Sequence, residues 1–221
     1  MLYLVATPIG DTKEITLRAL EILKKADIIL CESTKETSKL LKQLEIKAQR
    51  YELLNEHSTL DDLKHITQLC KDQLVALVSD CGTPGFCDPG NDLIRFCRAQ
   101  NIEIKSVLGP SSLMGLLSLS SKKLNEFVFR GFLPAETESR EKEWAKLKLE
   151  KKAIILMDTP YRLKKTLAEF SQYFPKRPAL LTLNLSQSEE LVIEGNASYL
   201  LQHINQDKAE FMLLIYPEEK N

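Results

Sequence analysis

The chain has 221 residues, of which 30 are Lys or Arg and 31 are Asp or Glu, so its formal net charge is -1. Its 8 Gly and 9 Pro make up about 8% of the chain, below the roughly 12% of an average protein, which excludes collagen-like, linker-rich and disordered classes. The near-zero charge argues against binding nucleic acid through bulk electrostatics and leaves room only for a local basic face. With 43% hydrophobic residues, this length suits two small domains with substantial cores.

No apolar run approaches the roughly 18 to 20 residues of a membrane span, and the opening MLYLVATPIG has neither a basic leader nor a cleavage site. We therefore expect a cytoplasmic protein without a membrane partner. Five cysteines, at positions 31, 70, 81, 87 and 97, form no C-x-x-C pair, and only three histidines accompany them. We predict buried free thiols and no metal site.

Strands and helices alternate through the first half. Residues 2–7 are apolar enough for a buried strand, and residues 14–26 then carry apolar side chains at helical spacing, with Asp11 and Glu14 as a start signal. Asp88, followed by Pro89, is predicted to cap a later helix. The predicted strands are 2–7, 27–31, 48–53, 74–79 and 102–108, and the predicted helices are 14–26, 34–44, 59–72 and 88–100.

This alternation implies right-handed crossovers and a mostly parallel sheet, so the fold class is α/β. A short apolar helix follows Ser112 and runs into a polar break near residues 120–125, so we place the first domain at 1–118 and the second at 119–221. The second domain has predicted strands at 127–133, 153–157, 179–185, 190–194 and 210–216, and predicted helices at 137–150, 160–171 and 197–205.

Six of the nine prolines lie beyond the carboxyl end of a predicted strand, where open α/β sheets bind ligands, although proline also ends strands for purely structural reasons. No G-x-G occurs, and residues 85–92 have the glycine gap of a P-loop but carry Asn91 where lysine is needed. There is no G-x-S-x-G string either. Rossmann, P-loop and serine-hydrolase chemistry therefore have little support.

Four strings carry a family resemblance: residues 6–34, VSDCGTPGFCDPG (78–90), GPSSLMG (109–115) and FVFRGFLP (127–134). In their order and spacing they resemble the tetrapyrrole methylase superfamily, and most closely its ribosomal branch, the rRNA small subunit methyltransferase I family. The resemblance runs from Leu2 to about Tyr216, and the S-D-x-G-T-P-x-x-x-D-P-G string is its most specific part.

This resemblance implies two α/β domains, with a mostly parallel sheet in the first, a mixed sheet in the second and a cofactor cleft between them. It also implies a homodimer that transfers a methyl group from S-adenosylmethionine to a ribose 2′-hydroxyl of small-subunit rRNA. A sulfonium carried on adenosine and an amino acid calls for backbone polar groups and hydroxyls rather than phosphate-binding glycines. The turn at residues 82–84 would bring backbone close to such a ligand.

Carried over residue by residue, the family's cofactor contacts fall in the loops after predicted strands, and less securely in the second domain. Taken singly, each residue also has a structural reading: the prolines as turns, Phe86 as core, and the two serines as helix caps. The contacts are Pro8, Gly82, Thr83, Pro84, Phe86, Ser111 and Ser112, then Leu163, Leu183 and Ala209.

Methyl transfer to a hydroxyl needs an aligned acceptor and a group that receives a proton. The candidates are Glu32, His57 and Asp80, and Glu32 matches the acidic residue of the family's E-D-T-R string, which here is ESTK. Each also has a structural reading: a solvated strand end for Glu32, a surface loop for His57, and a local turn cap for Asp80.

The chain departs from the ribosomal pattern where the family has R-E-L-T-K followed by Glu, because residues 183–190 read LNLSQSEE and lack both cations. The F-E-S-P-H-R string likewise reads LMDTPYR at residues 156–162. A loss of cations is what a changed acceptor or weak catalysis would produce. The alternatives left open are methylation of a tetrapyrrole or another small molecule, and a non-catalytic regulatory protein that binds S-adenosylmethionine.

Overall fold

The computed structural model describes residues 1–218, which divide into two compact units, Met1–Ser111 and the residues from Ser112 onward. The division comes one short helix earlier than the expected boundary after residue 118. That helix, α5 (Ser112–Ser118), packs on the second unit, since Leu116 is fully buried beside Leu214 in one apolar cluster.

The first unit contains a five-stranded sheet in which every pair of neighbours is parallel, in the order β3-β2-β4-β1-β5. The strands are short and mostly buried, and their apolar residues pack on both faces, as is typical of parallel sheets. Their bounds are β1 (Leu2–Val5), β2 (Ile28–Cys31), β3 (Tyr51–Leu53), β4 (Val75–Val78) and β5 (Ile104–Val107).

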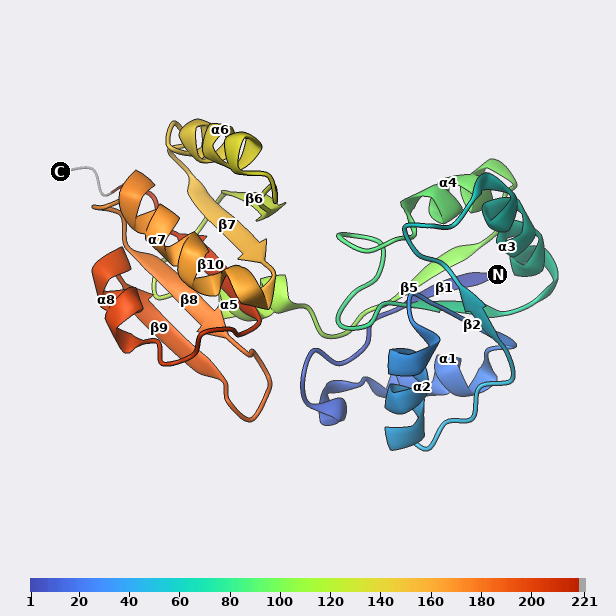
Figure 1. The fold of residues 1–221 in the computed structure, drawn as a ribbon. Coiled ribbons are helices and arrows are strands. Elements are labelled where there is room, and N and C mark those ends of the chain that lie inside the picture. Colours follow the sequence, from blue (N-terminus) through green and yellow to red (C-terminus); the bar gives the residue numbers. More distant parts are fainter. Residues whose placement is uncertain (219–221) are drawn as a thin grey trace. The chain divides into compact units, whose positions relative to one another are not determined.

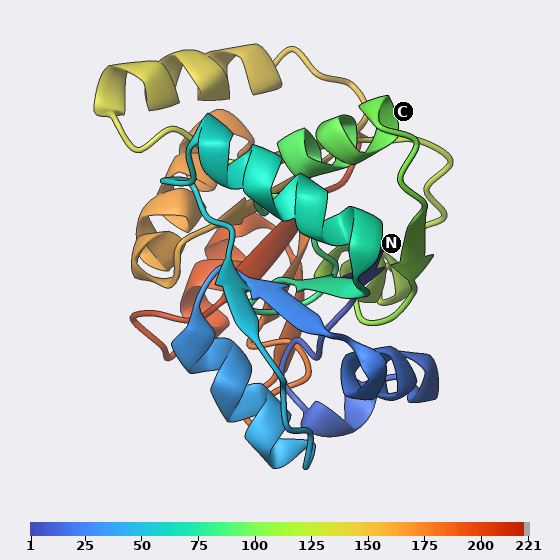
Figure 2. The ribbon, with the colours of Figure 1, turned by 90° about the vertical axis from the view of Figure 1, so that its right-hand side faces the viewer.

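Helices cover both faces of this sheet (Figures 1 and 2), and one apolar cluster lies on each face. From β1 through β3 the chain moves along the sheet in one direction, and from β3 through β5 it returns. Right-handed crossovers therefore place the first two helices on one face and the next two on the other. The helices are α1 (Leu17–Lys25) and α2 (Thr34–Gln43) on one face, and α3 (Leu60–Asp72) and α4 (Asn91–Ala99) on the other.

Two of the predicted helix starts are wrong. Asp11 caps only a 3-10 turn, η1 (Thr12–Glu14), and α1 begins later, after Thr16, whose hydroxyl accepts a hydrogen bond from the Ala19 N–H at 3.1 Å. Asp88 does not cap α4, because the residue at that position is Gly90, with φ of 146° and no side chain to accept a bond. The Asp88 side chain is thus available for another role.

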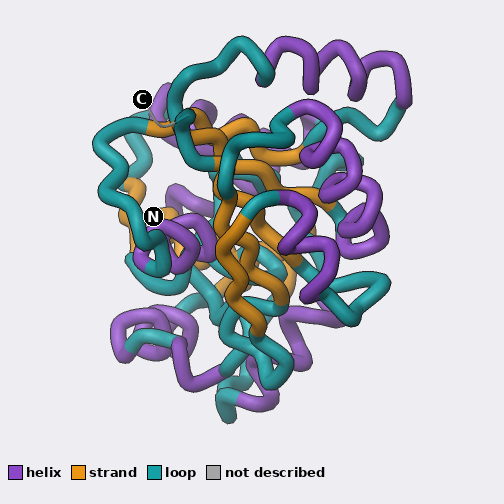
Figure 3. Tube along the Cα trace, turned by 90° about the vertical axis from the view of Figure 1, so that its left-hand side faces the viewer, coloured by secondary structure: helices purple, strands orange, loops and turns teal. Residues whose placement is uncertain are grey.

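The second unit has a mixed five-stranded sheet in the order β6-β7-β10-β8-β9. Only the β6–β7 pair is parallel, and the other three pairs are antiparallel. Figure 3 shows these strands lying side by side. Their bounds are β6 (Phe127–Phe132), β7 (Ala153–Asp158), β8 (Ala179–Leu183), β9 (Leu191–Gly195) and β10 (Phe211–Ile215).

Three helices pack on one face of this second sheet, and α5 packs on the other. The larger core contains Trp144, Leu167 and Leu200, one from each of the three helices, and all three are fully buried. The three helices are α6 (Thr137–Leu147), α7 (Leu163–Tyr173), which follows the 3-10 turn η2 (Pro160–Arg162), and α8 (Ala197–His203).

The predicted fold, two α/β units with a parallel and a mixed sheet, is confirmed. Within residues 1–218, no helix has both the length and the apolar character that a membrane crossing requires. The prediction of buried thiols is wrong for Cys81 and Cys87, which are exposed because they lie in the loop between β4 and α4.

Candidate functional site

The carboxyl edge of the first sheet carries a cavity of about 810 Å³. Neighbouring strands β2 and β4 lead into helices on opposite faces, and this is where open α/β sheets form ligand crevices. Segments that follow β2, β3 and β4 line the cavity, together with the start of α4. It brings together all three candidates for proton transfer: Glu32, His57 and Asp80.

Glu32 follows β2 directly and is half-buried. Burial raises the pKa of its carboxyl group to about 7, and the negative charges of Asp88 and Asp80 add to the shift. A hydrogen bond from the Asp80 backbone to the Glu32 carboxylate acts in the opposite direction. The result is a carboxyl group that exchanges its proton near neutral pH, as a proton acceptor must.

Asp80 and Asp88 belong to the same loop, between β4 and α4. Burial raises the pKa of both carboxyl groups, and in Asp88 a hydrogen bond with Ser79 partly offsets that effect. The Ser79 hydroxyl also lies 3.1 Å from the Cys81 carbonyl oxygen and 3.2 Å from that of Gly82, which holds the turn. Sequence analysis did not predict Asp88 as a site residue, because its position before Pro89 favoured a helix cap. Its place in the family's S-D-x-G-T-P-x-x-x-D-P-G string could have marked it as one.

His57 lies on the loop after β3, with its side chain 85% exposed at the rim of the cavity. Its backbone N–H donates to the Asn55 side chain at 2.9 Å, and its ring nitrogen Nε2 is 3.6 Å from a Glu56 carboxylate oxygen. The structure therefore brings His57 to the cavity without burying it.

The cavity is electronegative because five acidic residues line it: Glu32, Glu56, Asp80, Asp88 and Asp92. A phosphate group would be repelled there, whereas a cation or a neutral hydroxyl is compatible with these charges. Its volume lies within the usual range for small-molecule sites.

Hydrogen bonds join the loops that contain the predicted cofactor contacts of the first unit. Thr7, just before Pro8, pairs with Gly82 through two backbone bonds of 2.8 and 3.1 Å. The Thr83 hydroxyl donates to the Pro110 carbonyl at 3.0 Å. Three loops, after β1, β4 and β5, thus meet beside the cavity edge that Asp80 occupies.

The loop after β4 turns sharply at two glycines, Gly82 with φ of 78° and Gly85 with φ of 81°. These are left-handed conformations that residues with side chains seldom adopt. Pro84 between them is buried and Phe86 is 60% exposed, which excludes the reading of Phe86 as a core residue.

Ser111 and Ser112, the two serines of the GPSS string, are both partly exposed. Ser111 ends the first unit, and Ser112 begins α5 of the second.

The three cofactor candidates of the second domain, Leu163, Leu183 and Ala209, gather at one edge of the mixed sheet. Leu163 begins α7, Leu183 ends β8, and Ala209 lies two residues before β10. All three belong to the same buried cluster, and each is at most 5% exposed. A ligand at this edge would meet their backbone rather than their side chains.

The segment that replaces the family's R-E-L-T-K string is the connection between β8 and β9. Asn184 and Ser186 in it have positive φ values of 48° and 66°. The Asn184 side chain accepts a hydrogen bond from the Glu210 N–H at 3.1 Å, which ties the connection to the segment before β10. This arrangement is built without the two cations of the family pattern.

Comparison with known proteins identifies the family. The profile of the Tetrapyrrole (Corrin/Porphyrin) Methylases matches residues 1–201. The chain belongs to the tetrapyrrole methylase family. It is 36% identical to the ribosomal RNA small subunit methyltransferase I of Neisseria meningitidis serogroup B, over 99% of this chain and 76% of the relative. It is also 36% identical to the protein of that name from Coprothermobacter proteolyticus, over 100% of this chain and 99% of the relative.

Solved structures of tetrapyrrole methylases share the fold. A uroporphyrin-III-C-methyltransferase from Thermus thermophilus aligns with a TM-score of 0.65 at 18% identity, covering 97% of this chain and 93% of its own. A structure of this kind of enzyme complexed with S-adenosyl homocysteine aligns at 0.64 and 14% identity, covering 97% and 96%. A diphthine synthase aligns at 0.73 and 13%, covering 97% and 89%. The chain is an S-adenosylmethionine-dependent methyltransferase.

Proposed function

We propose that this protein methylates a ribose 2′-hydroxyl of small-subunit rRNA. The observation that carries the proposal is the similarity, at 35–38% identity over nearly all of this chain, to relatives named ribosomal RNA small subunit methyltransferase I. The ribose hydroxyl comes from the family resemblance of the four loop strings.

The residues of the first unit fit the methyl donor. S-adenosylmethionine, when bound, supplies a methyl group on a cationic sulfonium, and the carboxylates of Glu32, Asp80 and Asp88 favour positive charge nearby. The exposed Thr83 hydroxyl and the glycine backbone of the same loop offer neutral polar groups. We assign donor binding to the residues named above in both units: Pro8, Gly82, Thr83, Pro84, Phe86, Ser111, Ser112, Leu163, Leu183 and Ala209.

Glu32 is the proposed proton acceptor. Bound S-adenosylmethionine would supply the methyl group for the 2′-oxygen and leave as S-adenosylhomocysteine, and the Glu32 carboxylate would accept the proton of that hydroxyl. Burial, together with the charges of Asp88 and Asp80, raises the Glu32 pKa to about 7, so that Glu32 is ionised in part at neutral pH and basic enough to accept the proton. His57, at the rim, is assigned to positioning the acceptor. Alignment of donor and acceptor supplies the rest of the acceleration.

The test uses donor labelled in its methyl group, incubated with 30S subunits or with a total small-molecule extract. Label in the RNA supports the proposal, and label in the extract only would replace it with a small-molecule acceptor. Calorimetric binding of S-adenosylhomocysteine with no transfer to either would indicate a regulatory binding protein. Glu32→Gln is expected to lower kcat by about 10²- to 10⁴-fold and to leave S-adenosylhomocysteine binding within twofold, because it preserves shape and removes the proton acceptor.

The family resemblance also supports two further proposals, that the protein works as a homodimer and that it acts in the cytoplasm, where ribosomal subunits are modified. Light scattering after size-exclusion chromatography measures the first: a mass near twice the 25.2 kDa of one chain is expected. Fractionation of cells that express the tagged protein measures the second.

A further inference from the structure

The second unit displays an aromatic ring among cations, at the carboxyl end of β7. Tyr161, the middle residue of the turn η2, is 80% exposed. The ammonium group of Lys208 lies 5.5 Å from the centre of the Tyr161 ring. Most of the ring surface nevertheless remains open to solvent. A single exposed aromatic residue would need no explanation, but a ring with a cation held over it and more cations around it does.

The charge around this ring is positive, although the chain as a whole has a net charge of -1. Lys164 pairs with Asp207, which joins the start of α7 to the segment between α8 and β10. Neither Lys165 nor Lys208 forms an ion pair with another residue of the described range 1–218. Within the two segments 160–165 and 205–208 there are four cations and one carboxylate.

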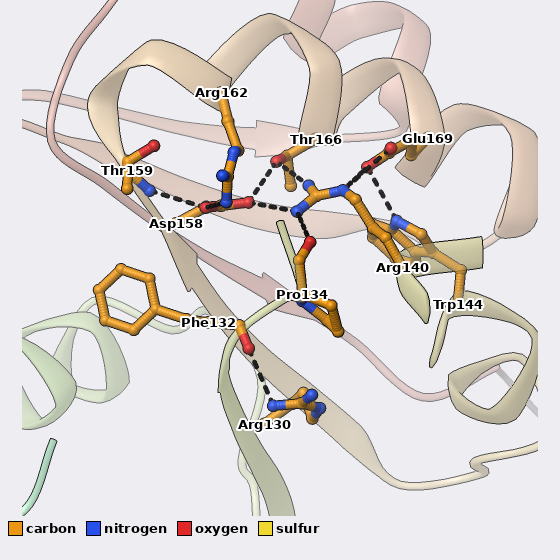
Figure 4. Close-up of polar contacts among 10 residues, drawn as sticks. All are labelled: Arg130, Phe132, Pro134, Arg140, Trp144, Asp158, Thr159, Arg162, Thr166 and Glu169. Atoms are coloured by element: carbon orange, nitrogen blue, oxygen red, sulfur yellow. Dashed lines mark hydrogen bonds and ion pairs between the residues drawn. The ribbon is translucent and has the colours of Figure 1, made fainter. Parts of the chain in front are cut away.

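A network of hydrogen bonds and ion pairs holds the turn that contains Tyr161 (Figure 4). The Asp158 carboxylate accepts hydrogen bonds from the Thr159 N–H at 2.8 Å and from the Arg162 side chain at 3.1 Å. The same carboxylate pairs with the fully buried Arg140 at 2.7 Å. The Arg162 N–H closes the turn on the Thr159 carbonyl at 2.9 Å. Tyr161 is thus exposed on a turn that is fixed at both ends, which lowers the entropy cost of using it as a binding surface.

We infer that Tyr161 is a stacking platform for an unpaired base of the RNA substrate, with Lys165 and Lys208 contacting the adjacent phosphates; this inference rests on the proposed function. A flat base matches an open aromatic face, and the phosphates on either side match the unpaired ammonium groups. A docked protein would instead require apolar surface around the ring, and the neighbouring side chains are charged.

The test compares Tyr161→Ala with Tyr161→Trp in methylation of 30S subunits and in direct binding of labelled small-subunit rRNA. We expect Tyr161→Ala to raise KM and Kd for RNA by roughly 5- to 150-fold, the range for loss of one base–aromatic stack, and Tyr161→Trp to retain binding. Binding of S-adenosylhomocysteine and the unfolding midpoint should not move. The matched control is Leu149→Ala, because Leu149 has an 81% exposed side chain in the turn between α6 and β7, and its loss should leave every value unchanged.

The salt dependence of RNA binding distinguishes the contribution of the two lysines from that of the Tyr161 ring. Lys165→Gln and Lys208→Gln should each reduce the slope of log Kd against log salt by about 0.7, whereas Tyr161→Ala should leave the slope unchanged. If the wild type methylates 30S subunits and Tyr161→Ala has the same KM and Kd for RNA, the inference is wrong while the proposed function stands; a surface for a protein partner would then replace it. If Tyr161→Ala loses S-adenosylhomocysteine binding, the ring belongs to the donor site and the inference is also wrong. No label in RNA and no RNA binding by the wild type would overturn both.

Discussion

Replacing Arg140 by methionine tests whether the buried charge cluster of Figure 4 holds the second unit together. The guanidinium of Arg140 donates to Asp158 at 2.7 Å, to Glu169 at 2.8 and 3.0 Å, and to the Thr166 hydroxyl at 2.8 Å. Its side chain is 1% exposed and that of Asp158 is completely buried. Methionine fills much of the same volume but leaves two carboxylates without their main partner.

The expected loss of stability comes from the carboxylates that remain buried after the guanidinium is removed. Removing one partner of a buried ion pair destabilises a protein by about 3–5 kcal/mol, because the remaining charge keeps its desolvation penalty. Arg162 still contacts Asp158 at 3.1 Å, and the Trp144 indole still donates to Glu169 at 2.8 Å, so we expect the lower end, about 3 kcal/mol. With a urea m-value of about 1–3 kcal/mol/M, the unfolding midpoint should fall by about 1 M or more.

The assay is urea unfolding followed by tryptophan fluorescence, since Trp144 is the single tryptophan of the chain and is buried in this unit. Arg18→Met is the matched control, because the Arg18–Glu21 pair is exposed to solvent on both sides and its loss should not move the midpoint. The double variant Arg140→Met/Asp158→Leu should recover part of the loss, because it removes one orphaned charge. A loss below about 1 kcal/mol for Arg140→Met would refute the reasoning, since it would mean that the carboxylates are solvated without the guanidinium.

Three further outcomes are expected in the first unit. Because Glu32 must be ionised to accept a proton and its pKa is about 7, kcat/KM should rise with pH up to about 7 and then level off, and Glu32→Gln should abolish that rise; an unchanged profile in the variant would exclude Glu32 as the base. Thr83→Val removes the 3.0 Å hydrogen bond to the loop after β5 and should weaken S-adenosylhomocysteine binding by about 2- to 10-fold in calorimetry, with little change in the melting temperature because Thr83 is exposed; equal affinity would contradict its role. Gly90→Ala places a Cβ 3.1 Å from the Leu77 side chain at φ of 146° and should cost roughly 1–3 kcal/mol in thermal unfolding, whereas Gly10→Ala, at an exposed position, should cost less than about 1 kcal/mol; equal stability of the two variants would show that the turn adjusts without strain.

Hydrophobic periodicity predicted the order and type of the elements because burial imposes a period of two on strands and 3.6 on helices. Helix starts were harder, because several side chains compete for each cap. Asp11 and Thr16 both precede α1, and only the tertiary fold decides that Asp11 closes a separate turn. The same competition led to Asp88 being read as a cap rather than as part of the cavity.

The grouping of Glu32, His57 and Asp80 follows from topology that local patterns do not contain. The three residues come from three different strand ends, and they meet because β4 inserts next to β2 in the sheet. The family strings marked Glu32 and Asp80 as candidates without showing that Asp88 lines the same cavity. The buried pair of Arg140 and Asp158 left no local signal either, since the partners are 18 residues apart and both residue types usually lie at the surface.

The net charge of -1 is the sum over regions of opposite sign, and the proposed function requires binding of both a sulfonium and a polyanion. The first unit gathers Glu32, Asp80 and Asp88 in a cavity, where partial burial keeps water from screening them fully. The second unit places Lys165 at the exposed start of α7 and Lys208 on the exposed segment before β10, where salt screens both charges within about 8–10 Å. On the proposed function, phosphates would be attracted by Lys165 and Lys208 and repelled by the acidic cavity, so the cavity itself favours a neutral sugar hydroxyl over a phosphate. On the proposed function, the absence of the family's arginine and lysine from residues 183–190 is compatible with RNA binding, because RNA affinity can come from other cations of the same unit, such as Lys165 and Lys208.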